Sequence, residues 1–143
     1  MPKLLVFAPC EKAIIDEHGN ATLIILMQNV GVQAGKEEIP KNAVTPKEWA
    51  VFALWEPLPE DYGKTFVQVL QTLLPDGSEF KKSEMRFQMQ EKLQQNRMAI
   101  MGFPVGQVGR LTLNMWLEVD SVRVGEVHSY CLTVSHIRDT AQL

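Results

Sequence analysis

The stretch PKEWAVFALWE, residues 46–56, decides the fold class. Side chains alternate between the two faces of an extended strand, so the residues at odd positions from Trp49 to Trp55 share one face. Ala50, Phe52 and Leu54 share the other. Both faces are apolar, which predicts a central strand that is covered on both sides.

Similar short apolar segments recur on either side of this strand, separated by Gly, Pro, Asn and Asp. Residues 3–8 form one such segment, and Gly19-Asn20 permits a tight reversal within a hairpin from about residue 12 to 30. Residues 31–45 are expected to form a loop with at most a short irregular strand. The alternation in RLTLNMWLEV (110–119) turns Leu111, Leu113, Met115, Leu117 and Val119 inward.

The chain as a whole is therefore predicted to be all-β. We expect one antiparallel β-sandwich domain of about eight to ten strands over residues 1–143. One segment leaves an alternative open: in SEMRFQMQEKLQQNR (83–97) the apolar residues fit either a strand or a short helix near residues 84–95. The preceding turn favours the strand, and the composition favours the helix.

Composition excludes several classes of partner. The 143 residues carry a net charge of −3 without a basic cluster, which argues against a nucleic-acid partner. No apolar run reaches the about 20 residues that span a bilayer, and the first apolar run is short for a signal peptide. We therefore expect a cytoplasmic protein without a membrane partner, in which the two cysteines stay reduced.

Three stretches resemble a family of small uncharacterised bacterial β-sandwich proteins, a domain of unknown function. They are VFAPCEKAIIDEHGNATLIILMQNV (6–30), the strand that leads into LLPDGSEF (73–80), and MGFPVGQVGRLTLNMWLEVDSVRVGEV (101–127). The matches concern strand order and turns. The resemblance implies the sandwich fold and no functional residues. The loop at 31–45 and the glutamine-rich stretch 88–95 depart from the family pattern.

Two groups of residues are candidates for binding. Trp116 and Asn114 lie, by parity, on the face opposite the inward leucines, where Trp116 could stack on a sugar or contact a partner. A covered Trp116 is the preferred alternative. The loop WEPLPEDYG (55–63) places Glu56, Glu60 and Asp61 close in sequence, which suggests either a calcium loop or, preferably, a solvated loop.

No catalytic motif is present in the sequence. Cys10 follows a proline and precedes Glu11, neither of which lowers a thiol pKa, so a buried structural cysteine is preferred over a nucleophile. In EVHSYCLTVSHI (126–137), His128 and His136 share one face and Cys131 lies on the other. Their separation argues against a shared zinc site, and we expect no metal or cofactor.

These observations favour a non-enzymatic binding or assembly module. Self-association is expected, because a sandwich has strand edges that can pair, with Trp116 as a candidate contact. The alternative is a β-sandwich that binds a small molecule or carbohydrate. An enzyme based on a cysteine or histidine is the third, less favoured interpretation.

Overall fold

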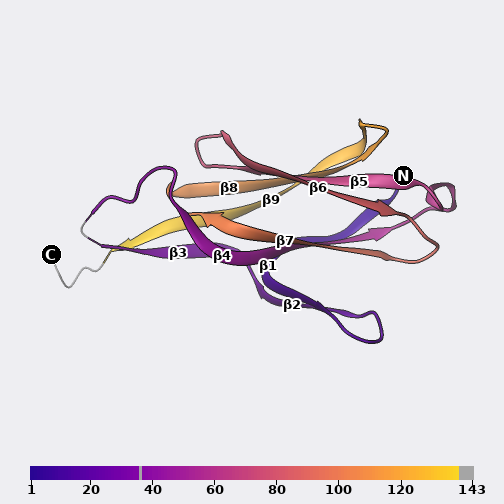
Figure 1. Cartoon of the computed structure of the whole chain (residues 1–143), viewed down its shortest axis with the longest axis horizontal. Coiled ribbons are helices and arrows are strands. Elements are labelled where there is room, and N and C mark those ends of the chain that lie inside the picture. The colour runs from indigo at the N-terminus through magenta and orange to yellow at the C-terminus, as the bar shows by residue number, and fades with distance from the viewer. Residues whose placement is uncertain (36, 139–143) are drawn as a thin grey trace.

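A computed structural model describes residues 1–35 and 37–138 of the chain. Nine strands form two packed sheets, with no α-helix in the described residues (Figure 1). The all-β prediction is therefore confirmed. The elements are β1 (Lys3–Ile15), β2 (Ala21–Leu26), β3 (Asn29–Ala34), β4 (Val44–Glu56), the 3-10 turn η1 (Pro59–Asp61), β5 (Thr65–Leu73), β6 (Glu79–Gln88), β7 (Gln94–Pro104), β8 (Gly109–Val119) and β9 (Val122–Arg138).

One sheet has four antiparallel strands in the order β2-β1-β4-β7, and the other has five in the order β3-β9-β8-β5-β6. One pair departs from the antiparallel expectation, because β3 runs parallel to β9 from Asn29↔Thr133 to Ala34↔Arg138. Only two residues separate β2 from β3, so the chain passes to the other sheet there instead of turning into a hairpin. The short strand within the expected loop is thus β3, and it begins two residues before that loop.

The interior of the sandwich matches the alternation in the sequence. The odd-numbered residues from Trp49 to Trp55 on β4 and from Leu111 to Leu117 on β8 all lie in one core cluster. The indole N–H of Trp49 donates to the carbonyl oxygen of Gly102 at 3.0 Å, which satisfies the polar atom of a fully buried ring. β4 is central and pairs with β1 and β7, as its two apolar faces predict.

The segment 84–95 contains no helix, so that alternative is wrong. β6 ends at Gln88, a turn follows, and β7 begins at Gln94. Met89 is buried, and its backbone exchanges hydrogen bonds with Gly63 and Lys64 (2.8 and 2.9 Å), which prolongs the extended conformation past the end of β6. The burial of every second side chain, as in a strand, thus prevails over the helical propensity of this segment.

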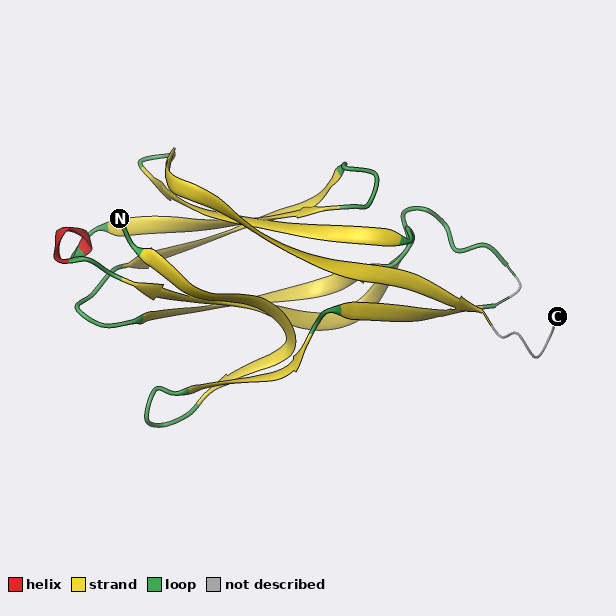
Figure 2. Ribbon diagram, turned by 180° about the vertical axis from the view of Figure 1, so that it is seen from behind, coloured by secondary structure: helices red, strands yellow, loops and turns green. Residues whose placement is uncertain are grey.

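The outer face of the four-stranded sheet carries a third layer. The β1–β2 hairpin leaves the sheet and folds back below the sandwich (Figures 1 and 2). Beneath it, a second small apolar cluster consists of Cys10, Ala13, Ala50 and Phe52, with Leu23 and Leu54 packed against it. The second apolar face of PKEWAVFALWE is therefore covered by this hairpin.

Candidate functional site

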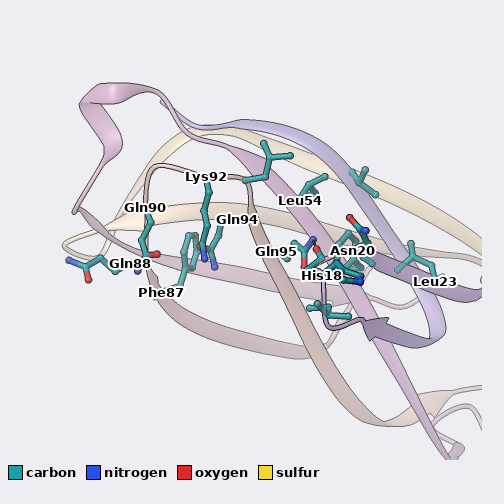
Figure 3. A pocket seen from close by; sticks show the side chains of 16 residues that line it. His18, Asn20, Leu23, Leu54, Phe87, Gln88, Gln90, Lys92, Gln94 and Gln95 are labelled. Carbon is teal, nitrogen blue, oxygen red and sulfur yellow. Dashed lines mark hydrogen bonds between the residues drawn. The ribbon is translucent and has the colours of Figure 1, made fainter.

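A cleft of about 1090 Å³ opens between the tip of the β1–β2 hairpin and the outer face of the four-stranded sheet (Figure 3). We call it the hairpin cleft. Its apolar floor includes Val6, Leu23, Phe52 and Leu54. Its rim is polar and comes from the hairpin tip, the turn between β6 and β7, and the start of β7. The polar side chains that line it are His18, Asn20, Gln88, Gln90, Lys92, Gln94 and Gln95.

Hydrogen bonds hold the hairpin over the sheet. The Gln95 side-chain amide donates to the carbonyl oxygen of Gly19 at the hairpin tip (2.7 Å). The Arg97 guanidinium donates to the carbonyl oxygen of Ala13 at 2.9 Å. Both donors lie on β7, so the hairpin spans the sheet from β1 to the opposite edge. The tip itself is ordered by Asp16, whose carboxylate accepts the backbone N–H groups of His18 and Asn20 at 2.9 Å.

The glutamines of the rim are oriented by the protein. Gln88 donates its amide N–H to Gly63 (2.9 Å), and Gln94 donates to Asn96 (2.9 Å). Among the hydrogen bonds of residues 1–35 and 37–138, none engages the Oε1 atom of Gln88, Gln94 or Gln95. These oxygens are hydrogen-bond acceptors at the rim that a ligand with hydroxyl or amide donors can reach.

The charge of the cleft differs from that of the whole chain. No Asp or Glu is among the described residues that line it, whereas Lys92 and His18 are. Figure 3 shows Gln90 and Lys92 on one side, and His18 and Asn20 beside Gln95 on the other. The nearest carboxylates stand outside the lining at the hairpin tip, where Asp16 accepts the backbone N–H groups of His18 and Asn20 and Glu17 Oε1 lies 3.5 Å from His18 Nε2.

Trp116 and Asn114 lie elsewhere, on the outer face of the five-stranded sheet. Trp116 is half-buried, its indole N–H donates to Glu118 at 2.9 Å, and the Lys82 ammonium lies 5.6 Å from the ring centroid. Asn114 accepts a hydrogen bond from Ser129 at 2.6 Å. Trp116 and Asn114 are thus both engaged by neighbouring side chains. Neither residue lies at the hairpin cleft.

The three acidic residues of WEPLPEDYG also separate. The Asp61 carboxylate is buried and accepts the backbone N–H of Leu58 at 2.8 Å, which caps η1. Glu60 is exposed, and a hydrogen bond from the Met1 amino group at 2.7 Å lowers the pKa of its carboxyl. Glu56 is exposed at the end of β4. No cluster of three His, Cys, Asp or Glu side chains suited to a metal ion occurs in the described residues.

Cys10 is fully buried beneath the hairpin, as expected of a structural cysteine. Burial raises the pKa of its thiol, opposite to what a nucleophile requires.

Cys131 is exposed on the other sheet. His128 packs edge-to-face on Trp55 with ring centroids 5.9 Å apart, and His136 contacts the carbonyl oxygen of Val105 through Nε2 at 2.6 Å.

No protein-family model matches the chain, and no curated protein matches it in sequence. The resemblance to the small bacterial family therefore stays a prediction. In the described residues no helix is long and apolar enough to cross a bilayer.

One feature of the sequence points to the hairpin cleft. The stretch 88–95 is rich in glutamine and interrupts an otherwise apolar pattern of strands. Four of its glutamines line the cleft. The pattern could not reveal that the hairpin tip, seventy-six residues away in sequence, would meet Gln95.

Proposed function

We propose that this protein is a non-enzymatic binding module whose site is the hairpin cleft. The observation that supports this most is the combination of an apolar floor with an oriented, carboxylate-free amide rim. Ligand sites typically enclose about 300–1,000 Å³ and combine apolar walls with a few placed polar groups. The cleft, at about 1090 Å³, has room for an extended ligand.

The proposed ligand is an uncharged or weakly anionic oligosaccharide. Side-chain amides can both donate to and accept from sugar hydroxyls. The apolar faces of sugar rings can pack on Val6 and Leu54, the floor side chains that remain partly exposed. His18 and Lys92 supply additional donors at the rim, and Lys92 favours a weak negative charge.

Binding is favoured over catalysis for a specific reason. A general acid and base need two titratable groups placed around a reacting atom. The titratable side chains that line the cleft are His18 and Lys92, which come from different segments on its rim. A cytoplasmic location is part of the proposal, and the two free cysteines support it.

Isothermal titration with a panel of neutral, N-acetylated and uronic-acid oligosaccharides tests the proposal. Ala21→Trp places a large ring in the cleft and should weaken binding of the active sugar by about tenfold or more, equivalent to at least 1.4 kcal/mol. Thr22→Trp is the matched control, since this neighbour in β2 is exposed and lies outside the lining. The proposal fails if no sugar binds the wild type, or if Ala21→Trp binds as tightly as Thr22→Trp.

A further inference from the structure

A chain of hydrogen-bonded side chains runs from the rim of the hairpin cleft into the interior of the sandwich. Gln94, which lines the cleft, donates an amide N–H to Asn96 Oδ1 at 2.9 Å (Figure 3 shows Gln94 at the rim). Asn96 donates in turn to Gln68 Oε1 at 2.9 Å, and the Trp55 indole N–H donates to the same oxygen at 2.8 Å. Asn96, Gln68 and Trp55 are buried. A polar residue of the cleft is thus connected to the core.

Two neighbours of Gln68 determine which way its amide faces. An indole N–H can only donate, so the Gln68 atom that faces Trp55 must be the carbonyl oxygen. The Gln68 amide nitrogen lies 3.2 Å from the Met98 sulfur, which can only accept. The reverse orientation would turn an NH2 group toward the indole and leave a buried donor unsatisfied, which is unfavourable. Gln68 therefore has one favoured orientation.

This orientation is passed on to Asn96 and then to Gln94. Asn96 must turn its amide nitrogen toward the Gln68 oxygen, which leaves its own carbonyl oxygen on the side of Gln94. Gln94 meets an acceptor there and must donate to it. Each step follows from the one before, because a side-chain amide has donors at one end and an acceptor at the other. The Oε1 atom of Gln94 is consequently the end left for the cleft.

We infer that Trp55, Gln68 and Asn96 are positioning residues that make Gln94 present its carbonyl oxygen to the hairpin cleft. None of the three is among the described residues that line the cleft, so each acts through the next. The use of this oxygen by a ligand rests on the proposed function, whereas its orientation does not. Under that function, Gln94 accepts from a donor of the ligand, a sugar hydroxyl or the N–H of an acetamido group.

The variant Gln94→Glu reports this orientation without any ligand. The introduced carboxyl faces Asn96 Oδ1, so it can make this hydrogen bond only when it is protonated. We expect its pKa, measured by NMR titration of the full chain, to lie about one unit or more above the ordinary value for glutamate. Burial also raises a carboxyl pKa, and the Lys92 ammonium and a protonated His18 at the rim lower it. The test is therefore the change in this pKa between backgrounds that leave these influences unaltered.

Trp55→Phe combined with Met98→Leu removes both groups that orient Gln68. In this background the Gln68 amide can reverse, and Asn96 can then turn its amide nitrogen toward the introduced carboxylate. A hydrogen bond to the ionised form favours that form. The pKa of the introduced carboxyl should therefore fall by about one unit, which is a tenfold loss of proton affinity.

Trp49→Phe combined with Met115→Leu is the matched control. Trp49 and Met115 are also buried, but the Trp49 indole donates to the carbonyl oxygen of Gly102, outside the amide chain. The pKa of the introduced carboxyl should stay raised in this background. Equal pKa values in the two backgrounds would overturn the inference. Circular dichroism confirms that the variants fold.

A second measurement uses the wild type and so does not depend on how the variants fold. Trp55 and Asn96 donate to one oxygen, so their N–H protons lie close together. A strong nuclear Overhauser cross-peak between the indole proton of Trp55 and the side-chain amide protons of Asn96 is expected. Its absence would show that the Asn96 amide is reversed, with its protons toward Gln94, and would overturn the inference.

Sugar titration separates this inference from the proposed function. The probes are maltotetraose, tetraacetylchitotetraose and tetragalacturonate, one from each class of the panel. Gln94→Met keeps the length of the side chain but lacks the amide, and it should weaken binding of the active sugar by about tenfold. If a sugar binds this variant as tightly as the wild type, the amide chain positions no ligand group and the inference fails. If no sugar binds the wild type, the proposed function fails, while the NMR results alone support or overturn the orientation of Gln94.

Discussion

Two buried amides lie between the sheets in an otherwise apolar core. Gln68 on β5 accepts hydrogen bonds from the Trp55 indole (2.8 Å) and from the Asn96 amide (2.9 Å), both of which belong to the other sheet. Gln68 and Asn96 are fully buried. These directional contacts fix the registry of one sheet on the other, which apolar packing alone specifies less sharply.

Gln68→Leu should therefore destabilise the fold. The substitution leaves the Trp55 and Asn96 donors without their acceptor, and each unsatisfied buried donor costs about 1–3 kcal/mol. We expect a loss of about 2–4 kcal/mol in the free energy of unfolding, measured by urea denaturation. Gln71→Leu, on the outward face of the same strand, should lose less than about 1 kcal/mol. Equal losses in the two variants would contradict this role for Gln68.

At the scale of single residues, the sequence predicted which side chains are buried better than it predicted which side chains they contact. The alternation around Trp49 and Leu113 placed both in the core. It also placed Trp116 outward, but it could not show that Lys82 and Glu118 would contact the ring. These contacts depend on pairing between strands, which alternation within one strand does not determine.

Among the elements, the β8–β9 hairpin has a turn whose sequence and conformation disagree. Asp120 and Ser121 have φ values of 51° and 64°, so this two-residue turn is of the I′ type. Such turns favour glycine at the second position, because a side chain there clashes with the backbone. Aspartate tolerates the left-handed region better than serine does.

Ser121→Gly should accordingly stabilise the protein. Relief of the left-handed conformation should outweigh the added freedom of the unfolded chain, for a net gain of about 0.5–1 kcal/mol in the free energy of unfolding. Thermal and urea denaturation measure it. The same substitution at Ser135, an exposed position within β9, should instead lose about 0.5–1 kcal/mol. A destabilised Ser121→Gly would show that this turn is not strained.

Strands were predicted correctly where the alternation of apolar residues within one segment was enough to define them. β4 and β8 follow from alternation over ten or more residues. β3 was expected at most as a short irregular strand within a loop, because its partner β9 lies about a hundred residues later and is parallel, without a hairpin turn to mark it. Segment 84–95 was ambiguous because its glutamine, lysine and glutamate residues suit helices, and pairing with β5 decides in favour of a strand.

In the molecule as a whole, the hairpin cleft depends on three segments that are distant in sequence. Its floor comes from β1, β2 and β4, and much of its rim from residues 87–95. Each segment is recognisable in the sequence, but their juxtaposition follows from the bend in β1 that folds the hairpin over the sheet. A single sequence does not encode that bend in any local pattern, so the cleft could not have been predicted.

Three loops at one end of the sandwich meet at a single carboxylate. Asp76, in the β5–β6 turn, accepts hydrogen bonds from Ser78 (2.9 Å from the backbone nitrogen) and Gln107 (3.1 Å). The Lys41 ammonium lies 3.3 Å away. Lys41 belongs to the β3–β4 connection and Gln107 to the β7–β8 connection, so Asp76 ties loops of both sheets together. These contacts, the Ser78 hydrogen bonds above all, hold the pKa of Asp76 well below its ordinary value.

This depressed pKa makes the whole fold sensitive to acid in a defined direction. A carboxyl whose folded pKa lies below its unfolded value of about 3.9 adds stability above that pH, and the contribution disappears as the pH falls further. Asp76→Asn should therefore be less stable than the wild type at pH 7, and the difference should shrink as the pH falls below about 4. Urea midpoints measured at several pH values from neutral to strongly acidic test this.

Glu126→Gln, in the exposed β8–β9 hairpin, is the control and should follow the wild-type curve. If the curves of Asp76→Asn and the wild type stay parallel into acid, Asp76 does not clamp these loops, and their arrangement depends on apolar packing alone.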